Sequence, residues 1–311
     1  MSDIRFDGRV AVVTGAGNGL GRCFALALAA RGAAVVVNDL GTAPDGRGRS
    51  DAVAQGVVDE IVAAGGRAMP SCETVATQAG GAAIVQTALD AFGRVDIVIS
   101  NAGFIRNSRL EAMPEADFDA VIETHLKGAF NLAQPAFRAM QQQGYGRFIL
   151  ASSGAGLFGL PYQANYAAAK AGLAGLSHVL ALEGASHGIM SNALLPVGLS
   201  RGWENMGPEF ASMPNHDLTP VMDRLSPDYV APLVLYLASD RCQATHGLYS
   251  AVAGRYARVF TAVTEGWHSP SGAPPSPEDV ERHWTEVEDR SVYYEPLVHS
   301  DEFIPILRKQ S

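Results

Sequence analysis

Residues 9–21 read RVAVVTGAGNGLG, a short apolar run followed by a turn with glycines at every second position from Gly15 to Gly21. The run is rich in β-branched residues and predicts a buried strand, and the next segment, 22–31 (RCFALALAAR), predicts a helix. Glycines at such a junction allow a tight turn and let a pyrophosphate approach the backbone at the helix N-terminus. Glycine-rich turns are common, but here strand, turn and helix come in the order that a dinucleotide site requires. The cofactor contacts expected in this turn are Gly15, Asn18, Gly19, Leu20 and Gly21.

A second apolar run, residues 34–38, ends in Asp39, eighteen residues past Gly21. A carboxylate at this distance from the glycines is placed to hydrogen-bond the ribose hydroxyls of an adenosine. It would also repel a 2′-phosphate, and the glycine turn contains no Arg or Lys. The pattern therefore favours NAD over NADP. A solvated acid at the end of a strand is the alternative interpretation of Asp39.

Tyr166 and Lys170 are four residues apart in an Ala- and Leu-rich segment, 164–182, that predicts a helix, and Ser153 lies thirteen residues upstream of the tyrosine. Residues four apart on a helix share a face. An ammonium one turn away favours the phenolate and lowers a tyrosine pKa from its usual value of about 10. A tyrosine tuned in this way can exchange a proton with an alcohol or carbonyl oxygen. Alternatively, a surface helix carries Tyr and Lys by chance.

Strands and helices alternate through residues 9–252, which predicts an α/β fold with a doubly wound parallel sheet in a single domain. Ligands of such sheets bind at the carboxyl ends of the strands. The small residues after the strand at 95–99 would let a cofactor lie close to the backbone. Further cofactor contacts are therefore expected from Thr74 and Val75 after the third strand, from Asn101, Ala102 and Gly103 after the fourth, and from Pro196, Val197 and Gly198 after the sixth.

The segments TGAGNGLG (14–21) and SNAG (100–103), Ser153 and YAAAK (166–170) together resemble the short-chain dehydrogenase/reductases, in order and spacing, across roughly residues 8–255. The resemblance implies a Rossmann fold, a nicotinamide cofactor and a homodimer or homotetramer packed through helices 115–143 and 162–186. It also implies roles for individual residues: Tyr166 as the acid–base, Lys170 lowering its pKa and holding the nicotinamide ribose, Ser153 orienting the substrate oxygen, and Asn101 beside the cofactor.

A narrower resemblance rests on NDLG (38–41), PDGRGRS (44–50), HLKG (125–128), QANY (163–166) and PDYVAPLVLYL (227–237). These segments are similar to the dehydrogenase domain of the peroxisomal multifunctional enzymes of type 2 (17-beta-hydroxysteroid dehydrogenase type 4). The resemblance implies oxidation of (3R)-hydroxyacyl-CoA with NAD. We expect no hydratase or sterol-carrier domain in 311 residues, and the ending KQS is not a peroxisomal SKL-type signal.

His125 departs from the pattern of the broader family, whose members mostly carry an asparagine at this position to hold a water on the path to the lysine. The resemblance leaves two interpretations of His125: a member of the proton relay, or a hydrogen-bonded structural residue.

Two segments interrupt the alternation of strands and helices. Residues 199–225 follow the sixth strand and contain glycines and prolines that break regular structure. Long insertions at such places are often lids, so we expect this segment to cover a bulky apolar substrate; a fixed structural excursion is the alternative. Residues 255–311 form a C-terminal extension beyond a catalytic domain at 1–254. Substrate contacts expected in the lid are Trp203, Met206 and Phe210, beside Ser153.

The composition indicates a soluble enzyme. A net charge of −9 and an isoelectric point near 5.3 argue against nucleic acid as a partner. No window approaches the length of a transmembrane segment, and the first residues, MSDIRFDGRV, do not form a signal peptide. Three cysteines without a CxxC pair suggest a reducing compartment, so we expect a cytoplasmic protein without a metal site.

The sequence thus predicts an NAD-dependent oxidation of a secondary alcohol, with a (3R)-hydroxyacyl-CoA or another bulky acyl-CoA or steroid side-chain alcohol as substrate. A hydroxysteroid or aryl-alcohol dehydrogenase is the alternative among enzymes. A non-catalytic NAD-binding regulator is the alternative from another class, and the presence of Ser153, Tyr166 and Lys170 argues against it.

Overall fold

The computed structural model describes residues 3–198, 219–270, 273–303 and 306. The chain divides into two compact units, Met1–Arg258 and Val259–Ser311, which are described separately below. Among the described residues, no helix combines the length and the apolar composition needed to cross a bilayer.

The first unit is built on an eight-stranded sheet in the order β3-β2-β1-β4-β5-β6-β7-β8. The recorded pairings from β3 through β7 are all parallel. The strand order reverses direction at β1 and β4, and this switch point is where a doubly wound sheet opens a crevice. The predicted fold class is therefore confirmed. The strands are β1 Val10–Thr14, β2 Ala34–Asn38, β3 Arg67–Ser71, β4 Ile97–Ser100, β5 Gly146–Ala151, β6 Ile189–Val197, β7 Gly247–Val252 and β8 Arg255–Val259.

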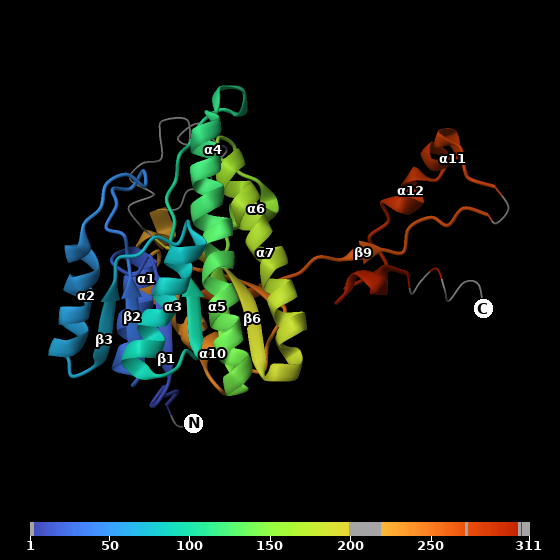
Figure 1. Ribbon diagram of the computed structural model, residues 1–311. Helices are drawn as coiled ribbons and strands as arrows, with labels where there is room; N and C mark the ends of the chain where they lie inside the picture. Colours follow the sequence, from blue (N-terminus) through green and yellow to red (C-terminus); the bar gives the residue numbers. More distant parts are fainter. Residues whose placement is uncertain (1–2, 199–218, 271–272, 304–305, 307–311) are drawn as a thin grey trace. The chain divides into compact units, whose positions relative to one another are not determined.

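Helices cover both faces of the sheet (Figure 1). Because successive residues of a strand point to opposite faces, β1 contributes to two cores. Ala11 and Val13 belong to a core with residues of α1, α2 and α10, whereas Val10 and Val12 belong to one with residues of α3, α5 and α7. The helices are α1 Gly19–Ala30, α2 Asp51–Ala63, α3 Gln78–Phe92, α4 Glu115–Ile122, α5 Gly128–Gln143, α6 Gly154–Phe158, α7 Ala164–Gly184 and α10 Ala231–Ala238, with short 3₁₀ turns at Leu110–Ala112, Ala185–His187, Thr219–Arg224 and Pro227–Tyr229.

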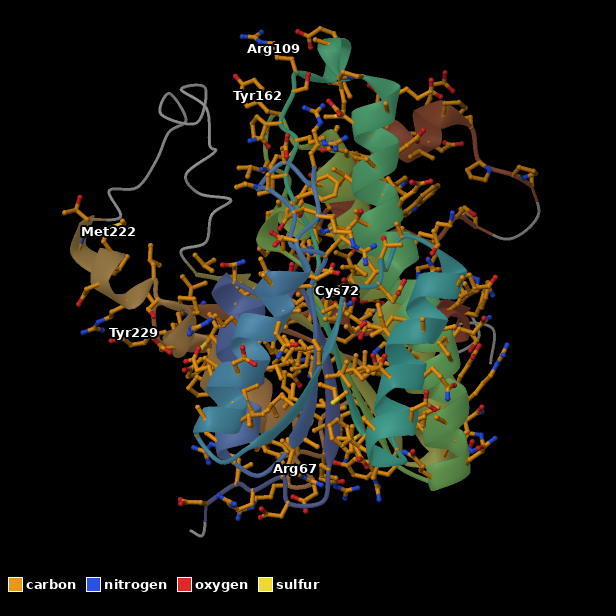
Figure 2. All side chains as sticks on the ribbon, turned by 60° about the vertical axis from the view of Figure 1, so that its left-hand side comes forward. Arg67, Cys72, Arg109, Tyr162, Met222 and Tyr229 are labelled. Carbon is orange, nitrogen blue, oxygen red and sulfur yellow. The ribbon has the colours of Figure 1, made fainter. Side chains whose placement is uncertain are left out.

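The strands run from the end of the unit that carries Arg67 towards the end that carries Arg109 and Tyr162 (Figure 2). Arg67 is the first residue of β3, and Cys72 directly follows its last residue. The carboxyl ends of the strands therefore face the loops around Arg109 and Tyr162.

The helix expected at 115–143 is interrupted. A π-helical turn, η2, spans Glu123–Lys127 between α4 and α5 and carries His125. Such turns occur frequently at functional sites. The helix expected from residue 162 begins instead at Ala164, because Tyr162 has a left-handed backbone with φ 67°.

Strand β8 was not expected. It follows β7 through the two residues Ala253 and Gly254, both with positive φ (50° and 82°). Two consecutive left-handed residues are typical of a type I′ hairpin turn, so β8 returns antiparallel to β7.

The second unit contains a two-stranded antiparallel ladder and short helices. Strand β9 is Val263–Thr264 and β10 is Tyr293–Tyr294. The short helices of this unit are α11 Pro277–Arg282 and α12 Trp284–Val287, and a 3₁₀ turn follows at His299–Phe303. Ser276 and Asp279 form a reciprocal capping box at the start of α11.

Candidate active site

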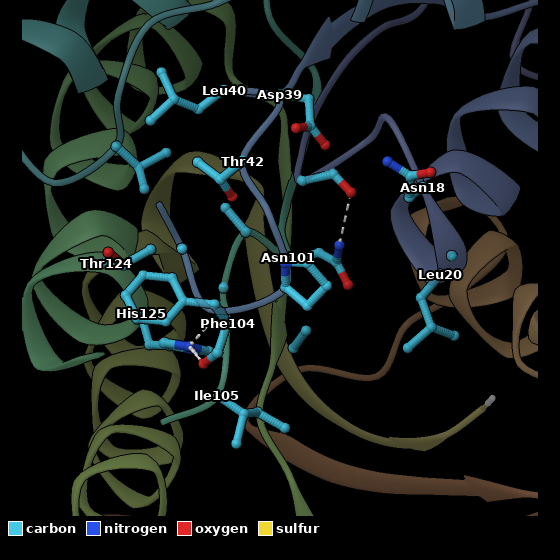
Figure 3. Close-up of a pocket in the computed structure, with 18 of the residues that line it drawn as sticks. Asn18, Leu20, Asp39, Leu40, Thr42, Asn101, Phe104, Ile105, Thr124 and His125 are labelled. Atoms are coloured by element: carbon cyan, nitrogen blue, oxygen red, sulfur yellow. Dashed lines mark hydrogen bonds between the residues drawn. The ribbon is translucent and has the colours of Figure 1, made fainter. Parts of the chain in front are cut away.

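A cleft opens at the carboxyl ends of the central strands, on both sides of the switch point (Figure 3). It brings together predicted residues from segments far apart in the sequence. The predicted residues that line it are Gly15, Asn18, Gly19, Leu20, Asp39, Thr74, Val75, Asn101, Ala102, Gly103, His125, Tyr166, Lys170 and Pro196.

The glycine turn fits a phosphate group. Gly15 has φ 63°, and a Cβ there would lie 2.8 Å from the Cα of Ala102. Asn18 precedes α1 without capping it through its side chain, so the first amides of α1 are open to an anion. Gly21 does not line the cleft, because it packs inward: a Cβ on it would lie 2.1 Å from the carbonyl oxygen of Gly15.

Asp39 is held by two backbone amides. Its Oδ2 accepts a hydrogen bond from Gly17 N at 2.8 Å, and its Oδ1 accepts one from Gly41 N at 2.7 Å. The carboxylate therefore joins the glycine turn to the loop after β2. Gly17 was not among the predicted contacts. A Cβ at this position would lie 2.8 Å from the Asp39 carboxylate.

Thr14 joins the end of β1 to the loop after β4. Its Oγ1 accepts hydrogen bonds from Asn101 N and Ala102 N, both at 3.1 Å. The Asn101 side chain donates in return to the carbonyl oxygens of Thr14 and Gly15, at 3.2 and 3.3 Å. Asn101 thus fixes the glycine turn within the cleft (Figure 3).

Tyr166 and Lys170 lie on α7, and Ser153 lies at the N-terminus of α6. Lys170 Nζ is 5.4 Å from the centroid of the Tyr166 ring and donates to the carbonyl oxygen of Ala151 at 2.5 Å. The Ser153 hydroxyl caps α6 by accepting from Ala155 N at 3.2 Å. Ser153 does not line the cleft, whereas its neighbour Ser152 does.

Burial dominates the pKa values of this group. It raises the pKa of Tyr166, against a smaller lowering by the hydrogen bond from Ser153. It lowers the pKa of Lys170 to about 7. We expected Lys170 to lower the pKa of Tyr166, but the net change is upward, because a low-dielectric surrounding disfavours the phenolate and the ammonium alike.

His125 lies on the π turn with only 4% of its surface exposed. Its Nε2 is 3.0 Å from Phe104 N and 2.8 Å from Phe104 O, and its ring meets the Tyr166 ring edge-on with centroids 5.3 Å apart. Gly103 makes room for the ring, since a Cβ there would lie 2.0 Å from His125 Cε1. Burial first, and the charge of Lys170 second, lower the pKa of His125 to about 3. Within the part of the chain that the structure describes, its buried Nδ1 has no hydrogen-bond partner.

Some predicted residues lie elsewhere. Val197 and Gly198 do not line the cleft, and Gly198 packs against Leu20. Trp203, Met206 and Phe210, with most of the expected lid, lie outside the described residues.

The prediction also missed one wall of the cleft. This wall is formed by the loop after β2 and by the residues that follow Gly103. The length of the loop after β2, between a strand that ends at 38 and a helix that begins at 51, was the signal in the sequence for this wall. The missed lining residues include Leu40, Thr42, Ala43, Pro44, Gly46, Phe104, Ile105, Thr124 and Ser152.

Comparison with known proteins points to one family. Residues 9–203 match the family model described as short chain dehydrogenase. The chain is 44% identical over 283 residues to a short-chain type dehydrogenase/reductase of Mycobacterium tuberculosis, covering 91% of this chain and 95% of that protein. It is 41% identical over 295 residues to the mouse peroxisomal multifunctional enzyme type 2, covering 93% of this chain and 38% of that enzyme. The chain therefore spans well under half the length of the mouse enzyme.

Solved structures agree. Full-length peroxisomal multifunctional enzyme type 2 from Drosophila melanogaster superposes with a TM-score of 0.79 at 32% identity, covering 98% of this chain and 50% of that one. A short chain dehydrogenase from Mycobacterium avium superposes with a TM-score of 0.76 at 36% identity, covering 93% of this chain and 99% of that one.

Proposed function

This chain belongs to the short-chain dehydrogenase family and is an oxidoreductase, and from this premise we propose that it oxidises a secondary alcohol with NAD through Ser153, Tyr166 and Lys170. One observation carries the proposal: the Tyr166–Lys170 pair lines the same cleft as the glycine turn and Asp39. The proposed proton-transferring pair and the proposed dinucleotide site would thereby share one cavity.

The cleft fits the proposed cofactor. The open amides at the start of α1 suit a pyrophosphate. Asp39 keeps acceptor capacity for ribose hydroxyls beyond its two backbone hydrogen bonds, because a carboxylate can accept about four. NAD, when bound, supplies the hydride acceptor.

The protein's own part of the reaction is proton transfer. Tyr166 would take the hydroxyl proton of the alcohol, and Ser153 favours the phenolate that this step needs. Lys170 donates to Ala151 and can place a charge near the ring only in its ammonium form, which is lost as pH rises through its pKa of about 7. Ser153 would also hold the substrate oxygen as charge develops on it.

We propose a relay role for His125 as a neutral imidazole. With a pKa of about 3 it is not an imidazolium near neutral pH, so it cannot act there by delivering its own extra proton. Among the described residues Nδ1 has no partner, so it is free to donate a hydrogen bond when Nε2 accepts from Phe104 N, or to accept one when Nε2 donates to Phe104 O.

The substrate proposal is a (3R)-hydroxyacyl-CoA. It is supported by similarity to proteins named peroxisomal multifunctional enzyme type 2, and by 38% identity over 76% of this chain to a 3-oxoacyl-[acyl-carrier-protein] reductase of Synechocystis. The name of the Synechocystis protein specifies an acyl group with an oxygen at its third carbon. The hydroxyl group of a (3R)-hydroxyacyl-CoA is on the same carbon.

A substrate screen tests the proposal. NADH formation would be followed with (3R)- and (3S)-hydroxyacyl-CoA of several chain lengths, hydroxysteroids and aryl alcohols, each with NAD and with NADP. We expect the highest kcat/KM with the (3R)-thioesters and NAD. Preferred turnover of a free steroid or aryl alcohol would replace the substrate proposal, and NAD binding without any turnover would favour the non-catalytic regulator.

A further inference from the structure

We propose that Arg106 is a positioning residue that fastens the loop of residues 41–50, here called the β2–α2 loop, as a wall of the cofactor cleft beside Asp39. The inference rests on the proposed binding of NAD in this cleft. In this proposal the loop shapes the cleft and Arg106 holds the loop in place, and neither takes part in the reaction itself.

The β2–α2 loop is internally organised but carries glycines that permit movement. Its base is closed by a hydrogen bond from Ser50 N to Leu40 O at 3.1 Å, and its tip by one from Ala43 N to Arg47 O at 2.7 Å. Gly41, Gly46 and Gly48 all have positive φ. The loop contributes Thr42, Ala43, Pro44 and Gly46 to the lining of the cleft.

Arg106 reaches this loop from the segment after β4. Its Nε donates to the carbonyl oxygen of Asp45 at 3.0 Å, while its Nη1 donates to the Asp117 carboxylate on α4 at 2.8 Å. The planar guanidinium can serve two acceptors in different directions, which an ammonium on a flexible stem does poorly. The side chain is only 18% exposed, so water competes weakly for these bonds.

Phe104 completes the contact. The Arg106 guanidinium carbon lies 4.9 Å from the centroid of the Phe104 ring. Gly46 packs directly on the same ring, since a Cβ there would lie 2.4 Å from Phe104 Cδ1. One aromatic ring is thus shared by the arginine and the tip of the loop.

The backbone of Arg106 is anchored independently of its side chain. The buried Asn165 donates to the carbonyl oxygens of Arg106 and Asp117, at 3.1 and 3.2 Å, and accepts from Tyr166 N at 2.7 Å. Removing the guanidinium therefore frees the loop but leaves the tyrosine in place. This separation predicts weaker cofactor binding with little change in the maximal rate.

The first test compares Arg106→Gln with Arg47→Gln. Arg47 lies in the same loop, is 75% exposed and loses the same charge, so it controls for long-range attraction of the cofactor phosphates. If the loop of Arg106→Gln is closed about a tenth of the time, the Kd for NAD rises about tenfold. We expect kcat at saturating NAD within about twofold of the wild type, and a Kd close to the wild-type value for Arg47→Gln.

The second test leaves the arginine intact and compares Gly46→Ala with Gly48→Ala. Both glycines have left-handed backbones, with φ 84° and 82°. A Cβ at 46 would meet Phe104, whereas a Cβ at 48 would meet no atom of the described residues within 4 Å. Backbone strain is therefore matched, and the difference isolates the packing of the loop on the ring. We expect a raised Kd for NAD from Gly46→Ala that clearly exceeds the effect of Gly48→Ala.

Hydrogen exchange of the amides at 43–47 without added ligand separates this inference from the proposed function. Faster exchange in Arg106→Gln, with unchanged exchange in β1 and β4, supports the contact even if the wild-type protein turns out not to bind NAD. Unchanged exchange at 43–47, or a Kd for NAD within twofold of the wild type, overturns the assignment.

Discussion

Tyr166, Lys170 and His125 line one cleft. In each of them burial is the largest cause of the pKa shift, and the shift favours the neutral form of the side chain. The charge on Lys170 adds to this at His125, whereas Ser153 opposes it at Tyr166. The hydroxyl of Ser153 thus favours the phenolate form of Tyr166. The same hydroxyl also caps α6.

At the residue scale, Tyr166→Phe should abolish turnover and leave the Kd for NAD within a few-fold, because only the proton-transferring oxygen is removed. Tyr236→Phe on α10 is the matched control, since Tyr236 is 45% exposed and does not line the cleft. Initial NADH formation and calorimetric NAD titration measure the two properties. Activity above a few per cent in Tyr166→Phe would remove this residue from the proposed mechanism.

Asp39 should determine the choice of cofactor. A charge and hydrogen-bond preference of about 2–4 kcal/mol corresponds to roughly thirty- to a thousand-fold discrimination in kcat/KM between NAD and NADP. Asp39→Asn should narrow this ratio by weakening the use of NAD more than that of NADP. Asp45→Asn removes a neighbouring charge outside the cleft lining and should leave the ratio unchanged. Equal efficiency of the wild type with both cofactors would contradict the assignment.

His125 should make the fold sensitive to acid. Its pKa in the folded protein, about 3, lies below the unfolded value of about 6.5. Between these pH values His125 is protonated in the unfolded state but neutral in the folded state. Stability should therefore fall as pH drops from about 6.5 towards 3, by up to about 1.4 kcal/mol per pH unit from this group. His125→Gln removes the titration, and urea unfolding at pH 7 and pH 4.5 should show a smaller loss than in the wild type. Parallel losses in both proteins would mean that the ring is protonated in the fold.

At the scale of elements, a π turn and the short helix α6 place His125 and Ser153 beside the long helix α7. The π turn η2 sets His125 against Gly103 and Tyr166. Helix α6 lies so close to α7 that a Cβ on Gly156 would meet the backbone nitrogen of Ala171 at 2.6 Å. Because Ser153 caps the N-terminus of α6 and α7 carries Lys170, this close approach sets the spacing between the two residues.

Gly156→Ala should therefore push α6 away from α7. Overpacking of this kind costs about 1–3 kcal/mol, and the shift of Ser153 should also lower kcat. Gly56→Ala on α2 is the control, because its Cβ would meet none of the described atoms within 4 Å, and alanine should stabilise that helix by about 0.5–1 kcal/mol. Thermal melts and initial rates distinguish the two variants. A Gly156→Ala protein as stable and active as the wild type would show that α6 can move without consequence.

At the scale of the whole molecule, α7 presents an exposed stripe that supports the proposed homo-oligomer. Ala168, Ala171, Gly175, Val179 and Leu182 are all exposed and follow one another at spacings of three or four residues, which places them on one face. Val179 and Leu182 leave 49% and 47% of their surface uncovered in the single chain. A second copy packed against this face would bury them.

Val179→Glu should then reduce the mass measured by light scattering at micromolar concentration, because a charge would be buried at the contact. Val62→Glu on α2 is the control, since Val62 is exposed to a similar degree, 54%, on a helix outside the proposed contact. A wild-type monomer, or unchanged assembly of Val179→Glu, would rule out an oligomer through this face.

The sequence by itself determined the fold class, the family resemblance and the oxidoreductase class, all of which are confirmed. Each depends on local patterns: the apolar run before Thr14, the glycine turn, and Tyr166 four residues before Lys170. Strand order then brings such segments to one edge of the sheet, because parallel strands share their carboxyl ends.

Tertiary structure alone decided the direction of the pKa shifts in the site and the position of one of its walls. The pKa values of Tyr166 and His125 depend on how much protein surrounds each side chain, and no motif encodes that. The contact between Gly46 and Phe104 joins residues 58 positions apart, so it exists only once β2 and β4 lie in the same sheet. Sequence patterns report what neighbouring residues prefer, whereas burial and long-range packing are properties of the assembled fold.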